Sequence, residues 1–559
     1  MRQRRQARLP ERVGDDRLIG PAPARTLFDD ADELALQVPT SCRRSGRCHE
    51  CVVEVTSGAE LLGPKTAEEG FLRDPYRLAC QAVVTEPGAR VEFHALRRRL
   101  RILVPEREVR TAPIDPVVRV VGGMVCYGEE AIEPVRGGVY GLAIDLGTTT
   151  VVFELVDLQS GQTAEVVAIE NPQGFGGSDV MNRISYDEGP GHGELRQAVR
   201  KALNRELRDV YHRHGLDRRE VYEAVVVGNS TMRDIFFGLD VSSIGQRPYK
   251  SLTEHELLAG LRDSTATTKR AHELGFRAHP HARIWGAPLV ASHVGADVAA
   301  DLVALGVEEP DERAVMIVDI GTNTEVVVAA RGRVLAASCP AGPAFEGGLV
   351  TYGMQGSEGA IEALRLEEDG SFRYETIDGA SPRGICGSGL IDLLAELRRT
   401  GRMSPLGVFA DGASTLTVVP EAGITFSRAD ASALAQAKAA NTAGQWIVLR
   451  ELGLEPGDVD RLYLAGGFAT YVDVANAVAI GFLPPVPPER VVKAGNASVR
   501  GARQLLLSAS AREQLERTIR RIEHVELELV PDFFEIFVEG CQFKPMPSRL
   551  TSHGAGVAA

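Results

Sequence analysis

An internal repeat constrains the fold of this chain more than any other feature of its sequence. The strings GLAIDLGTTTVVFEL at 141–155 and VMIVDIGTNTEVVVA at 315–329 share one pattern. Each has an apolar strand, an aspartate, an aliphatic residue, Gly-Thr and a second apolar strand, which predicts a β-hairpin with a glycine-containing turn. The copies are separated by far more than the period of a short-repeat solenoid, so they indicate two related lobes.

The turn in each copy is suited to binding phosphate. Glycine lets the backbone come close to a ligand, and backbone N–H groups and threonine hydroxyls can donate to phosphate oxygens. The aspartate supplies an oxygen for Mg²⁺, usually through water. A single copy could merely close a hairpin, but one copy per lobe favours a nucleotide site. The candidate residues are Asp145, Gly147, Thr148 and Thr149 in the first loop and Asp319, Gly321, Thr322 and Asn323 in the second.

Four cysteines near the N-terminus form a second motif. The spacing C-x5-C-x2-C-x28-C is formed by Cys42, Cys48, Cys51 and Cys80. It has one residue more in its first gap than the plant-type [2Fe–2S] spacing. Zinc sites usually show two short C-x2-C pairs, and here there is one, so the spacing favours an iron–sulfur cluster. Zinc and unrelated buried cysteines stay open as alternatives. Ser45 and Gly46 help the loop turn closely around the sulfurs.

The amino-acid composition limits the cellular compartment and the classes of binding partner that we expect. The 559 residues suggest roughly three to five domains, and 44% hydrophobic residues allow several packed cores. A net charge of −14 gives no reason to expect nucleic acid or an acidic membrane as a partner. We find no run of 18 apolar residues, so no transmembrane helix is expected. Eight cysteines are too few for a disulfide scaffold and favour a reducing, cytoplasmic setting.

The pattern of apolar, glycine and cysteine residues changes several times along the chain. We expect a flexible tail over 1–20, a cysteine-containing domain over 21–93, a linker over 94–138, a first lobe over 139–309, a second lobe over 310–546 and a tail over 547–559. From residue 139 on, apolar strands alternate with helical stretches, which is typical of α/β architecture. The helical period predicts helices over 194–213, 296–307, 389–399 and 431–452.

A third glycine motif completes the nucleotide set. In LYLAGGFATY at 462–471, Gly466 and Gly467 permit close packing against a base or a ribose. The three motifs together resemble the ASKHA superfamily of sugar kinases, heat-shock ATPases and actin over about 139–546. The resemblance implies a two-lobed, actin/ribonuclease-H-like fold that binds ATP. It also implies an acidic residue on the helix before the second loop, and Asp297 lies there. This residue could orient water or hold hydrated Mg²⁺; an exposed aspartate or a helix N-cap is equally open.

Five further sequence strings point to one family within this superfamily. They are VVVGNSTM (225–232), CPAGPAFEGG (339–348), GICGSGLID (384–392), KAGNASVRGA (493–502) and FVEGCQFKP (537–545). Together with the preceding cysteine domain, they resemble the reductive activators of corrinoid proteins over nearly the whole chain. Within these strings, Glu346 is either an acid at a helix terminus or a nucleotide or Mg²⁺ contact.

This resemblance implies a function. A β-grasp ferredoxin domain over 21–93 would carry a [2Fe–2S] cluster, and ATP with Mg²⁺ would drive one electron to the corrinoid protein of a methyltransferase system. Co(II) would become Co(I). The electron would come from an external ferredoxin or reductase, and a homodimer is left open.

The sequence also departs from the family pattern. Arg43, Arg44 and Arg47 stand in the cysteine loop where a more glycine-rich sequence is expected. Only Cys541 lies near the C-terminus, so a second cluster is not expected. The alternatives are an ATPase that donates electrons to another low-potential enzyme, a small-molecule kinase with a redox sensor, and a non-catalytic redox-sensing nucleotide-binding module. Activators of radical dehydratases share the ATPase fold, but they lack a ferredoxin domain.

Overall fold

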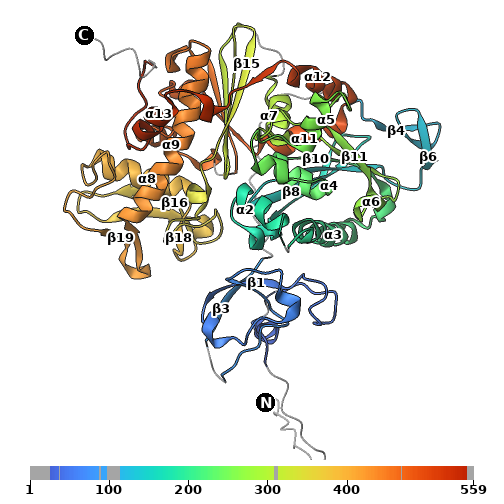
Figure 1. Cartoon of the computed structure of the whole chain (residues 1–559), viewed down its shortest axis with the longest axis horizontal. Coiled ribbons are helices and arrows are strands. Elements are labelled where there is room, and N and C mark those ends of the chain that lie inside the picture. The colour runs from blue at the N-terminus through green and yellow to red at the C-terminus, as the bar shows by residue number, and fades with distance from the viewer. Residues whose placement is uncertain are drawn as a thin grey trace, which may run out of the picture. The chain divides into compact units, whose positions relative to one another are not determined.

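The computed structural model describes residues 25–34, 36, 38–86, 90–96, 114–189, 191–307, 312–467 and 469–549. The chain forms two compact units, Met1–Ala95 and Leu96–Ala559 (Figure 1). The predicted tail over 1–20, residues 97–113 of the predicted linker and most of the predicted C-terminal tail lie outside the described residues.

The first unit is built on a small antiparallel sheet. Its strands run in the order β2-β1-β3, with bounds Tyr76–Leu78, Val52–Ser57 and Glu92–Ala95. Helix α1 (Leu27–Glu33) precedes the sheet. Its core side chains Leu27, Val53 and Leu78 are fully buried. The buried carboxylate of Glu69 accepts hydrogen bonds from Arg77 and from the backbone N–H of Leu78, which fixes the strand that leads to Cys80.

The first large sheet of the second unit carries the first copy of the repeat. Its strand order is β11-β12-β10-β7-β8-β9. The strands are β7 (Tyr140–Leu146), β8 (Thr150–Asp157), β9 (Thr163–Glu170), β10 (Val221–Gly228), β11 (Thr267–Arg270) and β12 (Arg283–Gly286). Strands β7 and β8 are antiparallel, with Asp145 opposite Val152, and β10 lies parallel to β7. The predicted hairpin over 141–155 is therefore confirmed.

The second large sheet repeats this arrangement in the order β22-β21-β13-β14-β15-β23. The strands are β13 (Val315–Ile320), β14 (Thr324–Ala330), β15 (Arg333–Cys339), β21 (Arg461–Ala465), β22 (Val491–Gly495) and β23 (Ile522–His524). Strands β13 and β14 form the predicted second hairpin, with Asp319 opposite Glu325. In both sheets the hairpin is followed by a third antiparallel strand, and a parallel strand flanks its first strand. This confirms the two related lobes.

Two helices connect the cores of these sheets. Helix α7 (Ala296–Leu305) buries Ala299 and Val303 with the first sheet, and Val298 and Leu302 with the second. Helix α11 (Ala497–Leu507) comes late in the sequence, yet it packs on the first sheet and on α7. A Cβ on Gly501 would lie 2.0 Å from the carbonyl oxygen of Ala300, so the two helices cross with backbones in contact.

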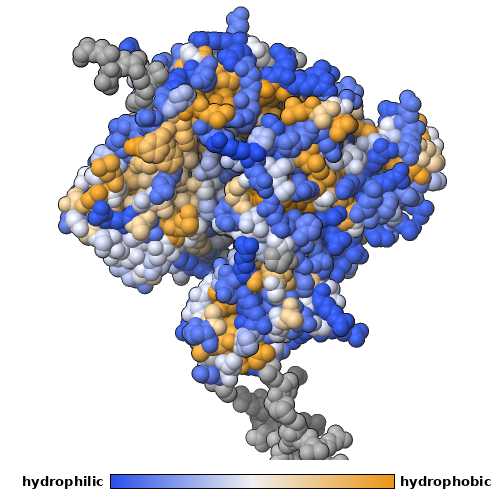
Figure 2. Space-filling view, in the orientation of Figure 1, coloured by the Kyte–Doolittle hydropathy of each residue, from blue (hydrophilic) through white to orange (hydrophobic). Residues whose placement is uncertain are grey.

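The remaining helices cover the sheets. They are α2 (Val180–Asp187), α3 (Glu194–His214), α4 (Ser230–Phe237), α5 (Leu252–Leu258), α6 (Ala271–Leu274), α8 (Gly387–Arg399), α9 (Arg428–Glu451), α10 (Val474–Ala479), α12 (Ala509–Ile519) and α13 (Phe533–Gly540). The four helices predicted from the sequence correspond to α3, α7, α8 and α9. Helices α9 and α13 lie side by side (Figure 1). Helix α13 buries Ile536 and leaves Phe534 71% exposed. Figure 2 shows apolar residues, in orange, at the surface in the part of the second lobe where Figure 1 places α9 and α13.

The segment 94–138 holds more structure than its prediction as a linker suggested. Strands β4 (Val118–Val121), β5 (Met124–Tyr127) and β6 (Glu130–Pro134) form an antiparallel sheet. Val118 and Val125 are buried in the core of the first lobe, so this sheet is part of that lobe's packing. The domain boundaries drawn from the sequence stay a prediction.

Two small sheets are added to the second lobe. One contains β16 (Ala360–Leu366), β17 (Phe372–Thr376) and β18 (Gly384–Ile385), and the other contains β19 (Thr415–Val419) and β20 (Ile424–Ser427). In the part of the chain that the structure describes, no helix is long and apolar enough to cross a membrane.

Candidate functional site

The four cysteines of the motif meet in the first unit. Cys48, Cys51 and Cys80 are buried, and Cys42 is half-buried. The sulfurs of Cys51 and Cys80 lie 3.4 Å apart. The hydroxyl of Thr40 lies 3.9 Å from the sulfurs of both Cys42 and Cys48. The thiols are therefore arranged as two pairs.

The loop that carries three of these cysteines is wound tightly. Arg43, Arg44 and Gly46 have positive φ angles of 55°, 64° and 80°. A Cβ on Gly46 would lie 3.0 Å from the Cγ of Glu68, so the glycine suits both the angle and the space. The winding turns hydrogen-bond donors toward sulfur. The pKa of Cys42 is lowered to about 6 because hydrogen bonds from Ser45 and Cys48 outweigh the effect of burial.

The second pair shares a proton. The Cys51 thiol donates to the Cys80 sulfur, which lowers the pKa of Cys80 to about 6 and raises that of Cys51. The backbone N–H of Gly46 also lowers the pKa of Cys80. Since iron binds thiolates, one sulfur of each pair is already favoured in the form that the metal needs.

The pairing tests which metal group fits these thiols. A separation of 3.4 Å is far too long for a disulfide bond of about 2.05 Å. It is close to the roughly 3.7 Å expected between two sulfurs on one tetrahedral metal with bonds of about 2.3 Å. Two separate pairs suit a two-iron cluster better than one zinc ion.

The two phosphate loops of the second unit meet at one carboxylate. Thr149 lies in the loop between β7 and β8, and Thr322 lies between β13 and β14. Their hydroxyl oxygens are 3.1 Å apart, and both hydroxyls donate to Oε2 of Glu346. The pKa of this carboxyl is raised by burial, although the two hydrogen bonds oppose the rise.

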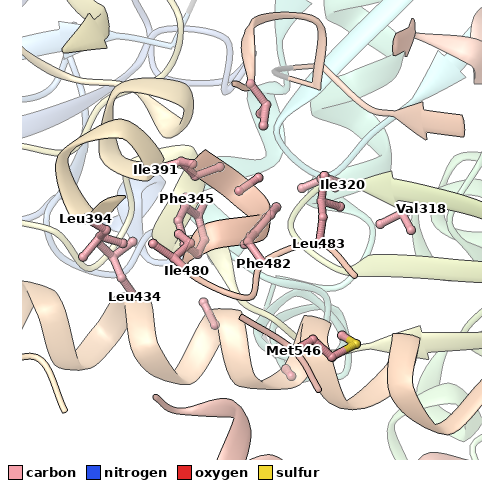
Figure 3. Close-up of a cluster of buried hydrophobic side chains, with 14 of the residues drawn as sticks. Val318, Ile320, Phe345, Ile391, Leu394, Leu434, Ile480, Phe482, Leu483 and Met546 are labelled. Carbon is pink, nitrogen blue, oxygen red and sulfur yellow. The ribbon is translucent and has the colours of Figure 1, made fainter. Parts of the chain in front are cut away.

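The hydrophobic core below the second loop fixes this carboxylate. Glu346 is the last residue of a short 3₁₀ helix, Pro343–Glu346. The preceding Phe345 is buried, and its ring packs edge-on against Phe482 with the ring centroids 4.9 Å apart. Figure 3 shows both rings in one apolar cluster with Ile391. The packing leaves the carboxylate at the surface of the core, where it faces both loops.

Asp145, Asp319 and Asp297 form a group of carboxylates between the sheets. Asp145 and Asp319 lie near the C-terminal ends of β7 and β13, and Asp297 lies in the first turn of α7. Burial, then the charges of Asp297 and Asp319, raise the pKa of Asp145 to about 8. Burial and the charge of Asp319 raise the pKa of Asp297 to about 7. The N-cap of α7 is Gly295, so the capping role considered for Asp297 is wrong.

Several neighbours of this group were not among the predicted site residues. Asp301, one turn further along α7, is fully buried and accepts a hydrogen bond from Ser498. Glu325 is buried opposite Asp319 on β14. Burial and the neighbouring carboxylates raise the pKa of both Asp301 and Glu325. The amide of Asn496 donates to Asp145 at 3.0 Å.

Asparagines also brace the first phosphate loop. Asn229 caps α4 and donates to the hydroxyl of Thr148 at 2.9 Å. Asn171 donates to the carbonyl oxygen of Gly147 at 2.8 Å. The sequence did offer a signal, since Asn229 and Asn496 both follow a glycine at a strand-to-helix junction and both cap the helix that follows.

Gly466 lies directly against the second phosphate loop. Its φ angle is 105°, and a Cβ at this position would lie 2.1 Å from the carbonyl oxygen of Ile320. Gly321 closes the same loop by donating its N–H to the carbonyl oxygen of Asn323. Gly467 is exposed, and a Cβ there would meet no atom within 4 Å. The third motif therefore adjoins the second, as a site that joins adenosine to phosphates requires.

Comparison with known proteins agrees with a cysteine-containing first unit followed by a two-lobed second unit. Residues 14–85 match the family described as the 2Fe-2S iron-sulfur cluster binding domain. Residues 140–310 match the RACo middle region, and residues 313–553 match the C-terminal domain of RACo, the ASKHA domain. The corrinoid activation enzyme RamQ of Eubacterium limosum is 31% identical over 431 residues, which are 72% of this chain and 70% of RamQ. This chain belongs to the family of reductive activators of corrinoid proteins.

Other members of the activator family are also similar. The [Co(II) methylated amine-specific corrinoid protein] reductase of Methanosarcina barkeri is 24% identical over 408 residues, 68% of this chain and 73% of that protein. A solved structure described as a reductive activator for corrinoid, iron-sulfur protein superposes with a TM-score of 0.68 and 26% identity, covering 94% of this chain and 96% of that one. The activator described here thus joins a [2Fe–2S] ferredoxin domain to an ASKHA ATPase domain, and its cofactors are the cluster and ATP with Mg²⁺.

Proposed function

We propose that this activator passes one electron to the Co(II) corrinoid of a partner protein in a methyltransferase system, giving Co(I), and that ATP hydrolysis drives the transfer. The bound [2Fe–2S] cluster would supply electrons one at a time. Cys42, Cys48, Cys51 and Cys80 hold it. A reduced ferredoxin or reductase restores the electron. We place this chemistry in the cytoplasm, where thiols stay reduced.

The ATPase lobes hold the nucleotide through the residues of the two loops. The backbones at Gly147 and Gly321 and the hydroxyls of the loop threonines donate to the phosphates. Asp145, Asp297 and Asp319 hold hydrated Mg²⁺ and orient the attacking water. Gly466 and Gly467 accept the adenosine, and Asn323 closes the second loop.

One observation carries the proposal: Glu346 accepts hydrogen bonds from Thr149 and Thr322 at once. The loops of the two lobes are close enough for a single anionic group to bridge them. A nucleotide phosphate is also negatively charged, and its oxygens accept hydrogen bonds in the same way. Its binding displaces Glu346 from the two hydroxyls, so the contacts between the lobes differ in the two nucleotide states. That difference is what coupling to a partner needs.

Replacing this carboxylate should strengthen nucleotide binding. In Glu346→Gln, the hydroxyls of Thr149 and Thr322 lose a charged acceptor, and the incoming phosphates lose a like charge. We expect the Kd of Mg-ATP to fall by roughly three- to tenfold, measured by isothermal titration calorimetry. Thr149→Val is the matched variant, and it should weaken binding. Weaker binding in Glu346→Gln would mean that the carboxylate contacts Mg²⁺ instead.

Binding of Mg-nucleotide should depend on pH. Burial raises the pKa of Asp145 to about 8 and that of Asp297 to about 7, against roughly 4 in the unfolded chain. These protons are bound more tightly in the folded state. The stability they give the unliganded protein is complete below about pH 4 and is lost as the pH rises through about 7 to 8.

Because Mg²⁺ needs deprotonated carboxylates, its binding must release these protons. We expect the Kd of Mg-ADP to fall by up to about tenfold per pH unit between about pH 6 and 7.5 for each proton released. Calorimetry in buffers of different ionisation enthalpy counts the protons. Asp297→Asn should flatten the dependence. A Kd that is constant with pH in the unsubstituted protein contradicts the assignment.

Product analysis tests the hydrolytic function against a kinase. An ATPase releases one phosphate for each ADP formed, whereas a kinase forms ADP without free phosphate. We expect equal amounts of phosphate and ADP, and a faster rate when a Co(II) corrinoid protein is added. ADP formation without phosphate would identify a kinase, and no turnover with the partner present would identify a sensing module.

A further inference from the structure

The cysteine set of the ferredoxin domain opens to solvent on one side. Cys51 is fully buried, and Cys48 and Cys80 are 6% and 8% exposed. Cys42 is the more exposed member, at the start of the loop that turns through Arg43 and Arg44. Electrons move efficiently between proteins only when the redox groups come close, so a partner approaches best where the sulfurs are least covered. That place is the outer rim of the loop 42–48.

The rim is basic. Arg43 and Arg47 are exposed, and neither forms a hydrogen bond or an ion pair with any described residue. Arg44 is different, because it pairs with Asp29 and Asp32 and lies 4.0 Å above the ring of Phe28. Arg44 therefore braces the loop against α1, while Arg43 and Arg47 keep their charges free for a partner.

This basic rim is a local exception. The chain as a whole carries a net charge of −14. Its field favours encounters with basic molecules, except where arginines are concentrated. The positive φ angles at Arg43, Arg44 and His49 fix the path of the loop, so the two free guanidinium groups sit on a shaped surface. Guanidinium pairs well with carboxylate in two-point contacts.

We propose that Arg43 and Arg47 form the docking surface for the electron donor, and that this donor is a small electron-carrier protein with carboxylates around its redox group. In the transfer, the carrier loses one electron and the ferredoxin domain gains one; no bond forms or breaks. The proposal deepens the proposed function, on which it rests, by giving the donor a charge and a point of contact.

The experiment follows reduction of the cluster-loaded, full-length protein by stopped-flow absorption. The donor is a purified acidic flavodoxin, fully reduced, whose own absorption change is recorded separately. We expect the second-order rate constant to fall steeply with ionic strength and to drop by about tenfold or more in Arg43→Glu/Arg47→Glu. Arg43→Gln/Arg47→Gln should lie between the two and guards against misfolding. The single variant Arg47→Glu should also slow the reduction, whereas Arg90→Glu, a single charge reversal at an exposed arginine of the same domain, should change the rate little.

Chemical reduction separates this proposal from the proposed function. Reduced methyl viologen needs no docking surface, so it should reduce the double variant at least as fast as the unsubstituted protein. ATP-dependent corrinoid reduction by protein charged this way should then be normal. Unchanged reduction by flavodoxin overturns the docking proposal. Slowed corrinoid reduction after chemical charging also overturns it, because the surface would then belong to the corrinoid partner. Failure of corrinoid reduction in the unsubstituted protein concerns the proposed function alone.

Discussion

Asp319→Asn is expected to lower ATP hydrolysis by about 100-fold or more while leaving the visible spectrum of the cluster unchanged. Asp319 is the penultimate residue of β13 and interacts with Asp297, and burial raises its pKa to about 6. Asparagine keeps the size of the side chain and removes its charge. Without that charge, water bound to Mg²⁺ would lose an anionic acceptor. The positive charge of the metal ion beside the phosphates would then be less well balanced by the protein. Hydrolysis is measured as phosphate release under anaerobic conditions.

The control for this variant is a surface aspartate of the same lobe. Asp369 lies in the turn between β16 and β17, and its carboxylate accepts hydrogen bonds from the backbone N–H and the hydroxyl of Ser371. Asp369→Asn should hydrolyse ATP at the normal rate. Near-normal hydrolysis in Asp319→Asn would mean that the second loop is not the metal-binding loop. Loss of the cluster spectrum in that variant would point to a global defect instead.

Cys48→Ser is expected to do the reverse. Cys48 is 6% exposed and adjoins Cys42 through the hydroxyl of Thr40. A serine oxygen is a poor substitute for thiolate toward iron, so we expect most of the cluster iron to be lost, together with electron transfer to the corrinoid. Iron and sulfide content and the visible spectrum measure this loss. Because the ferredoxin domain is a separate compact unit, the Kd of Mg-ADP should stay within about twofold.

Cys541→Ser serves as the matched control. Cys541 is half-buried at the end of α13, in the other unit, and it is not part of the cysteine motif. This variant should keep a full complement of iron. Retention of iron and spectrum in Cys48→Ser would exclude Cys48 as a ligand and would reopen the assignment of the cysteine set.

Local patterns predicted much of the fold because its key elements are local. Each hairpin of the repeat joins strands that are adjacent in sequence, and the register that places Asp145 opposite Val152 follows from one short turn. The helices α3 and α9 have lengths and apolar periods that a strand cannot satisfy. The spacing of the cysteines is likewise a local pattern, and it predicted an iron–sulfur cluster without knowledge of the fold.

The rest depends on contacts that no local pattern contains. Asn496 and Asp145 are 351 positions apart, yet they share a hydrogen bond. Helix α11 packs on the first sheet because its small residue Gly501 lets it cross α7 closely. Asp301 was not among the predicted site residues, and its burial and its hydrogen bond from Ser498 depend on the packing of α11 on α7. The bridge from Glu346 to both loops is likewise a product of how the two lobes meet.

One measurement tests the central claim most directly. The purified chain, with its cluster reduced, is mixed anaerobically with a Co(II) corrinoid protein, and visible spectra are recorded without nucleotide, with Mg-ATP and with a non-hydrolysable ATP analogue. The account predicts the Co(I) band with Mg-ATP and its absence without nucleotide. A Co(I) band of equal size and rate without ATP, or none with ATP from a chain whose cluster and ATPase are both intact, contradicts it.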